Sequence, residues 1–173
     1  QTTLMNDETM VALYEETVQL LEQHGFEQYE ISNYAKTGYQ SIHNTAYWDR
    51  KPYKGFGIGS SSFDGKIRST TTNNLKNYLN TAGQELSAIE TLTQKQELLE
   101  LLMLGLRQKK GLDLHRVLYF LNTDQAEVFR HTVQLLATRG LLEQENNTIR
   151  LSLKGFALEN EVIVRLLSSD DKN

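Results

Sequence analysis

The sequence has no cysteine, one proline, one tryptophan and no long apolar run in its 173 residues. Without cysteine, these residues can form no disulfide, thiolate nucleophile or cysteine-ligated metal or iron–sulfur centre. The longest apolar stretch, residues 98–106, is broken by Glu100 and Gly105, so no membrane span is predicted. A formal charge of −4 argues against a nucleic-acid partner, because phosphate binding requires a basic face.

Local patterns predict an α+β chain in two parts, residues 1–82 and residues 83–173. The elements expected in the first part are a helix from Asp7 to a stop at Gly25, a strand over 26–32, an irregular segment over 33–54, a glycine-rich strand over 54–65 and a helix ending at Gly83. Residues 80–92 have few aromatic side chains and little periodicity, which favours a boundary there.

The second part reads as a mostly helical, winged-helix-like unit. Its expected elements are a helix from a Thr93–Gln96 capping box to about Arg107, a short helix after Asp113, a helix from Asp124 to Gly140, a hairpin turning at Asn146 and Asn147, and a helix over 156–167. This order raises a DNA-binding alternative. The candidate recognition helix, residues 124–139, has balanced charges, so a structural or docking role is favoured.

The stretch "YEISNYAKTGYQSIHNTAYW", residues 29–48, concentrates aromatic rings around one histidine. His43 and Tyr47 are four residues apart, so on a helical turn they share one face, with Trp48 beside them. Neutral imidazole is a good ligand of iron, and flat rings can line a porphyrin. In the structural alternative, the rings fill a crevice and His43 bonds a backbone carbonyl.

The glycines of "GFGIGS" have two interpretations as well. Gly55, Gly57 and Gly59 either admit a nucleotide-like cofactor close to the backbone or permit a bulge or a tight neighbour. No helix follows at once, unlike in a dinucleotide-binding fingerprint. The serines over 60–62 lack the strand–turn–helix elbow that activates a nucleophile, so no catalytic residue is assigned.

Five motifs occur together and in a recognisable order: "YEISNYA", "HNTAYW", "GFGIGSSS", "LLMLGLR" and "LSLKGFALENEVIVRLL". They resemble the carboxyl-terminal part of HemW-type proteins. These belong to the radical S-adenosylmethionine (SAM) family related to oxygen-independent coproporphyrinogen III oxidase, HemN. The resemblance implies that the first part is the remnant of a partial (β/α)6 barrel, followed by the winged-helix-like domain.

The resemblance also implies a haem site. The family motif His-Asn-x-x-Tyr-Trp matches His43, Asn44, Tyr47 and Trp48 at every defined position. By resemblance, His43 is the axial ligand of haem iron, Tyr47 and Trp48 line the porphyrin, and Asn44 orients the loop.

In the family, the strands that correspond to "YEISNYA" and "GFGIGSSS" line the SAM side of the barrel. By resemblance, Ile31 and Ala35 of the first motif, and Gly57, Ile58 and Gly59 of the second, contact SAM. Ser61 departs from the pattern, because HemW-type sequences usually carry histidine there, so no role of that histidine is carried over to this sequence.

In the family, a CxxxCxxC loop near the start of the barrel holds the 4Fe–4S cluster that cleaves SAM. The cysteine-free sequence is therefore expected to be the carboxyl-terminal piece of a longer protein. The expected function is that of a cytoplasmic haem chaperone that passes haem to an acceptor protein, with any membrane association only through that acceptor. The alternative is coproporphyrinogen III oxidase, and the truncated barrel is expected to self-associate through apolar surface.

Overall fold

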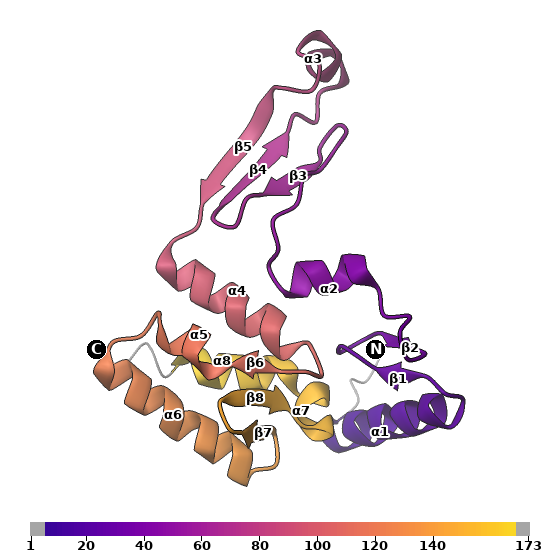
Figure 1. The fold of residues 1–173 in the computed structure, drawn as a ribbon, viewed down its shortest axis with the longest axis vertical. Helices are drawn as coiled ribbons and strands as arrows, with labels where there is room; N and C mark the ends of the chain where they lie inside the picture. Colours follow the sequence, from indigo (N-terminus) through magenta and orange to yellow (C-terminus); the bar gives the residue numbers. More distant parts are fainter. Residues whose placement is uncertain (1–5, 169–173) are drawn as a thin grey trace.

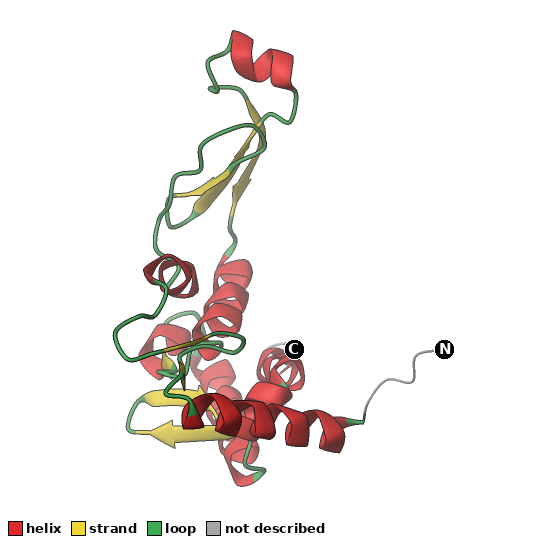
Figure 2. Cartoon of the chain, turned by 90° about the vertical axis from the view of Figure 1, so that its right-hand side faces the viewer, coloured by secondary structure: helices red, strands yellow, loops and turns green. Residues whose placement is uncertain are grey.

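A computed structural model describes residues 6–168, in which a narrow arm rises from a broad helical body (Figure 1). The elements are α1 (Asp7–Gln23), β1 (Glu27–Gln28), β2 (Tyr34–Ala35), α2 (Ile42–Trp48), β3 (Ser61–Phe63), β4 (Ile67–Thr71), α3 (Leu75–Asn80), β5 (Leu86–Thr91), α4 (Gln94–Leu106), β6 (Leu112–Asp113), α5 (Leu114–Leu118), α6 (Thr123–Thr138), β7 (Leu142–Glu145), β8 (Thr148–Leu151), α7 (Leu153–Ala157) and α8 (Glu159–Ser168). Residues 61–91 form the arm, and Figure 2 shows it from the side, with α1 lying across the base of the body.

The first helix leads into a strand that is shorter than predicted. Within residues 26–32, only Glu27 and Gln28 pair with β2. The prediction of a strand through residue 32 is wrong, because the backbone next bonds the chain that follows α4. The Ile31 N–H donates to the Arg107 carbonyl at 2.9 Å. This backbone hydrogen bond joins the amino-terminal segment to the end of α4.

The segment predicted to be irregular, residues 33–54, contains β2 and the seven-residue helix α2. Ser41 caps α2, its hydroxyl accepting from the Asn44 N–H at 3.2 Å. At the other end, the Arg50 N–H donates to the Tyr47 carbonyl at 2.9 Å while Arg50 has φ 55°. This left-handed position after the helix is usually taken by glycine, because a side chain there costs about 1–2 kcal/mol.

Residues 54–60 do not form the glycine-rich strand that was predicted; the strand is confined to Ser61–Phe63. Gly57 (φ 104°) and Gly59 (φ 67°) instead turn the chain back on itself. The Gly57 carbonyl accepts from the hydroxyls of Ser60 at 2.8 Å and Thr71 at 2.7 Å. These bonds fold the glycine loop against β4.

The arm is an antiparallel sheet in the order β3-β4-β5, with α3 at its tip (Figure 1). Ser69 of β4 pairs with Ser62 of β3 and with Ile89 of β5. The expected boundary between residues 82 and 83 falls between α3 and β5, so the sheet draws strands from both sides of it. In residues 6–168, all three sheets contain only antiparallel pairs.

The main core lies in the carboxyl-terminal part, where α4, α6 and α8 pack around the sheet β6-β8-β7. Leu102, Leu106 and Val117 are completely buried there. The helix predicted over residues 156–167 is instead two helices, α7 and α8, which meet at Leu158. Among residues 6–168, no helix combines the length and apolar character needed to cross a membrane.

Candidate functional site

A row of four aromatic rings leads from α2 into the base of the arm. The His43 and Tyr47 rings meet edge to face, with centroids 4.7 Å apart. The Tyr47 ring lies 4.7 Å from that of Tyr53, and the Tyr53 ring lies 6.2 Å from that of Phe63. Backbone bonds between Tyr53 and Phe63, at 2.8 and 2.9 Å, hold the last two rings in register.

The His43 imidazole lies at the exposed end of this row. In the described part of the chain, its nitrogens have no hydrogen-bond partner, and its ring contacts the Tyr47 ring. The hydrogen bond of the structural alternative, from His43 to a backbone carbonyl, is therefore not present among residues 6–168, although the rings of Tyr47 and Trp48 do line a crevice. A neutral imidazole in this setting has a free lone pair for a metal ion.

Beside the ring row lies a pocket of about 410 Å³ between α2, α4 and the arm. It is lined by Asn44, Tyr47, Trp48, Arg50, Lys51, Tyr53, Phe63, Arg68, Glu100 and Leu104. The pocket thus brings together three of the four residues predicted to hold haem. The fourth, His43, is not part of the lining but contacts Tyr47, which is. Pockets with flat apolar walls and a few polar groups are typical ligand sites.

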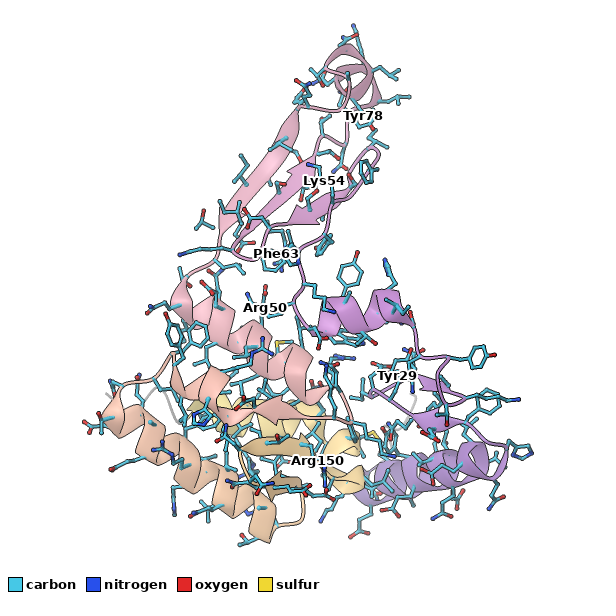
Figure 3. The ribbon with its side chains drawn as sticks, in the orientation of Figure 1. Tyr29, Arg50, Lys54, Phe63, Tyr78 and Arg150 are labelled. Atoms are coloured by element: carbon cyan, nitrogen blue, oxygen red, sulfur yellow. The ribbon has the colours of Figure 1, made fainter. Side chains whose placement is uncertain are left out.

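One carboxylate ties the walls of the pocket together. Glu100 of α4 accepts from Arg50 Nε at 3.3 Å and from Arg68 Nη2 at 2.8 Å. Both guanidinium groups also lie near the Phe63 ring, at 5.6 and 5.5 Å from its centroid. Figure 3 shows Arg50 and Phe63 facing the space between α2, α4 and the arm.

Trp48 links α2 to a cluster of buried charges. The Arg107 guanidinium lies 5.1 Å from the Trp48 ring centroid and 3.7 Å from Glu159 Oε1. Burial raises the pKa of Glu159, the Arg107 charge counteracts this, and the nearby Glu30 charge adds to the rise. Glu30 itself is 1% exposed, so the end of α4 holds two carboxylates with little access to water.

A second pocket, of about 470 Å³, lies on the other side of α2 and has a polar, basic lining that includes Lys51, Lys109 and Lys110. Asp49, at the carboxyl end of α2, accepts from Lys110 Nζ at 2.6 Å and from Gln108 Nε2 at 3.1 Å. Burial alone raises the pKa of Asp49, but these two hydrogen bonds lower it overall. The pair therefore fixes α2 against the chain that follows α4.

The residues assigned to SAM by resemblance are not brought together. Ala35 is buried in β2, and Ile31 packs against the main core in the body. Gly57, Ile58 and Gly59 lie in the loop that folds against β4 of the arm. The two groups lie on separate parts of the molecule (Figure 1). Ser61 is exposed on β3.

Sequence reasoning missed Arg50, Tyr53, Phe63, Arg68 and Glu100, which also line the pocket. Tyr53 and Phe63 carried a weak signal as aromatic residues close to the haem motif. The charged residues carried none, because their pairing crosses 32 or 50 positions of sequence. No cluster of three or more histidine or acidic side chains that could hold a metal ion occurs among residues 6–168.

Comparison with known proteins adds a family context. A family model described as the HemN C-terminal domain matches residues 92–158. The "Heme chaperone HemW" of Bacillus subtilis (strain 168) is 31% identical over 153 residues, which cover 87% of this chain and 40% of that protein. The "Heme chaperone HemW" of Lactococcus lactis is 29% identical over 168 residues, covering 96% of this chain and 44% of that protein. The chain thus spans less than half the length of these relatives.

A solved structure has a similar fold. The Escherichia coli coproporphyrinogen III oxidase HemN, described as a radical SAM enzyme, superposes with a TM-score of 0.61. The superposition covers 92% of this chain and 40% of that chain, at 18% sequence identity. At this identity the likeness concerns the fold alone.

Proposed function

We propose, from the premise that this chain is a relative of the carboxyl-terminal part of HemW-type and HemN proteins, that it holds haem at α2 and the adjoining pocket. In this proposal haem is the cargo, and the longer protein passes it to an acceptor protein. His43 provides the axial nitrogen, Tyr47 and Trp48 face the macrocycle, and Asn44 orients the segment.

The observation that carries the proposal is the free imidazole of His43. It is exposed, has no hydrogen-bond partner among residues 6–168, and stands at the end of a row of rings. The pocket next to it has the flat apolar walls that a macrocycle requires, and cationic groups in its lining. This donor set fits haem without a cysteine ligand, and the sequence contains no cysteine.

The finer fold assignment belongs to the same proposal. The order α4, β6, α5, α6, β7, β8, with the sheet β6-β8-β7, supports a winged-helix-like unit in residues 83–173. We assign it a docking role, since α6 carries Asp124 and Glu127 as well as Arg130, with Arg139 as the residue that follows its carboxyl end, so the charges balance. Residues 1–82 would complete a (β/α)6 barrel only with strands from a longer protein, and the likeness to HemN supports this arrangement.

The radical SAM chemistry is likewise assigned to the longer protein. A 4Fe–4S cluster and SAM would be held mainly outside this chain, with Ile31, Ala35 and the run 57–59 contributing only once a complete barrel brings them together. Exposed apolar side chains on the arm and on the glycine loop that folds against it, among them Leu79 and Phe56, support self-association of the isolated chain. The relatives named as haem chaperones favour the chaperone over the oxidase.

Titration with haemin tests the proposal. We expect the 173-residue chain to shift the Soret band of haemin, and His43→Ala to abolish the shift because the axial nitrogen is lost. His115→Ala is the matched control, since His115 lies in α5, away from the ring row. An identical spectrum for the wild type and His43→Ala would refute the assignment.

A further inference from the structure

We infer that the pocket between α2, α4 and the arm is a carboxylate subsite, in which Arg68 and Arg50 bind an acid side chain of the flat ligand. The inference rests on the proposed function, and for haem the acid groups would be the propionates. It assigns the specificity for carboxylates to residues outside the His43 motif.

The charge of the pocket is the first argument. Its lining carries three cations, Arg50, Lys51 and Arg68, against one anion, Glu100. The whole chain has a formal charge of −4, so this local surplus of positive charge runs against the average. A cationic pocket with aromatic walls is complementary to a flat apolar ligand that carries acid groups.

Unsatisfied donors are the second argument. Arg50 Nη2 and Trp48 Nε1 are buried and have no hydrogen-bond partner in the described structure. Both belong to residues that line the pocket, and both atoms can only donate. Buried polar groups are nearly always paired, and an acceptor that entered the pocket would pair these two donors; the other buried atoms without a partner, Glu30 Oε2, Arg107 Nε and Glu159 Oε1, belong to residues outside the pocket lining. A carboxylate is an acceptor with two oxygens.

The backbone at Arg50 is the third argument. Arg50 occupies the left-handed position after α2, with φ 55°, where glycine is the usual residue. Glycine would end the helix without strain but could not place a guanidinium beside Phe63 and Glu100. Strain retained at such a position is typical of functional sites.

Arg68 is the residue best placed to meet the ligand. Its side chain is 35% exposed, compared with 11% for Arg50, so it lies at the open side of the pocket. It shares Glu100 with Arg50 and lies 4.0 Å from the more exposed Glu90. An incoming carboxylate competes with Glu100 for the same two guanidinium groups, so Glu100 tunes the affinity of the subsite.

The test uses metal-free protoporphyrin IX, which has two propionates, and its dimethyl ester. Neither probe contains iron, so binding is independent of ligation by His43. Trp48 is the only tryptophan of the chain and lines the pocket, so quenching of its fluorescence reports binding directly. We expect the wild type to bind the free acid at least about tenfold more tightly than the diester, as a charge-assisted hydrogen bond to a guanidinium allows.

Variants then locate the acid group. Arg68→Gln should remove most of the preference for the free acid and leave diester binding unchanged, whereas Arg68→Lys should retain part of it. Glu100→Gln should tighten binding of the free acid, because it removes the competing carboxylate. Arg150→Gln is the matched control: Arg150 also pairs with glutamates at a similar exposure of 38%, but on the β7-β8 hairpin in the lower part of Figure 3.

The outcomes separate this inference from the proposed function. Equal affinity of the wild type for acid and diester, or an unchanged preference in Arg68→Gln, overturns the subsite even if the His43-dependent haemin shift is observed. A preference for the acid that Arg68→Gln removes supports the subsite even if haemin gives no His43-dependent shift. If Arg68→Gln loses its helical circular dichroism, Arg68→Lys and Glu100→Gln decide, with an unchanged preference in both overturning the inference.

Discussion

Arg107 offers the sharpest test of how α2 is held to the body. It lies over the Trp48 ring at 5.1 Å and pairs with Glu159 at 3.7 Å. We consider Arg107→Met, which keeps much of the side-chain volume but removes the charge. The change leaves Glu159, whose side chain is 9% exposed, without its cation.

The expected cost follows from these contacts. Removing one partner of a fully buried ion pair costs about 3–5 kcal/mol, and a cation–π contact adds about 1 kcal/mol. The Arg107 side chain is 30% exposed, so water screens part of the interaction. We therefore expect Arg107→Met to lower the free energy of unfolding by about 2–3 kcal/mol near neutral pH.

The pH dependence of this loss distinguishes electrostatics from packing. Burial already raises the folded-state pKa of Glu159 above its ordinary value of 4.5, and Arg107 opposes the rise. The stability linked to this group is fully present below about pH 4.5 and is lost as the pH rises through the raised pKa. Without Arg107 the pKa rises further, so the difference between wild type and variant grows with pH and is smallest near pH 4.5.

Urea unfolding followed by Trp48 fluorescence, at about pH 7.5 and about pH 4.5, measures the loss of stability and its dependence on pH. The double variant Arg107→Met, Glu159→Gln should recover much of the loss at the higher pH, because residue 159 then carries no buried charge that lacks its cation. Arg139→Met, at the exposed end of α6, is the control and should change little. The same loss at both pH values, with no recovery in the double variant, would refute the electrostatic reasoning.

Two further predictions concern the core and the end of α2. Leu102→Ala, at a side chain with no exposure, should cost about 2–5 kcal/mol in chemical denaturation, and a loss below about 1 kcal/mol would contradict its place in the core. Asp49→Asn should flatten the acid limb of the stability curve. The folded-state pKa of Asp49 lies below its ordinary 3.8, so its contribution is present above that value and is lost as the pH falls through the lowered pKa; an unchanged acid limb would count against this.

Sequence reasoning predicted α1, α4, α5 and α6, because their signals are local, but it missed α2 and merged α7 with α8. The Thr93–Gln96 capping box is present, with both reciprocal bonds. The predicted turn at Asn146 is also confirmed, with φ 52°. Helix caps and periodic apolar faces depend on residues within about four positions of each other, so they can be read without the rest of the fold.

The strand predictions were poorer for the opposite reason. Residues 26–32 alternate as a strand does, and residues 54–65 were predicted to be a strand despite their glycines, yet only a short piece of each segment pairs with another strand. After Gln28 the first segment no longer pairs with β2, and its backbone bonds the end of α4 instead. The second segment turns at Gly57 and Gly59. Strand pairing depends on distant partners, which the local pattern does not contain.

By itself, the sequence determined the kinship of the chain. Its motifs resembled those of HemW-type and HemN proteins, and the comparisons confirm that likeness. It also singled out the four haem-motif residues, His43, Asn44, Tyr47 and Trp48, which lie within six consecutive positions. Their haem-binding role stays a proposal, because a motif records a likeness to other proteins and not the surroundings of an imidazole.

Only the tertiary structure decided what stands next to that motif. The pocket exists because α2, α4 and the arm meet, and Glu100 reaches Arg50 and Arg68 across 50 and 32 positions of sequence. The structure also places Ile31 and Ala35 apart from the glycine loop, although the family motifs had assigned all of these residues to one SAM site. Contacts over such distances arise from the packing of whole elements, and no local pattern of residues specifies them.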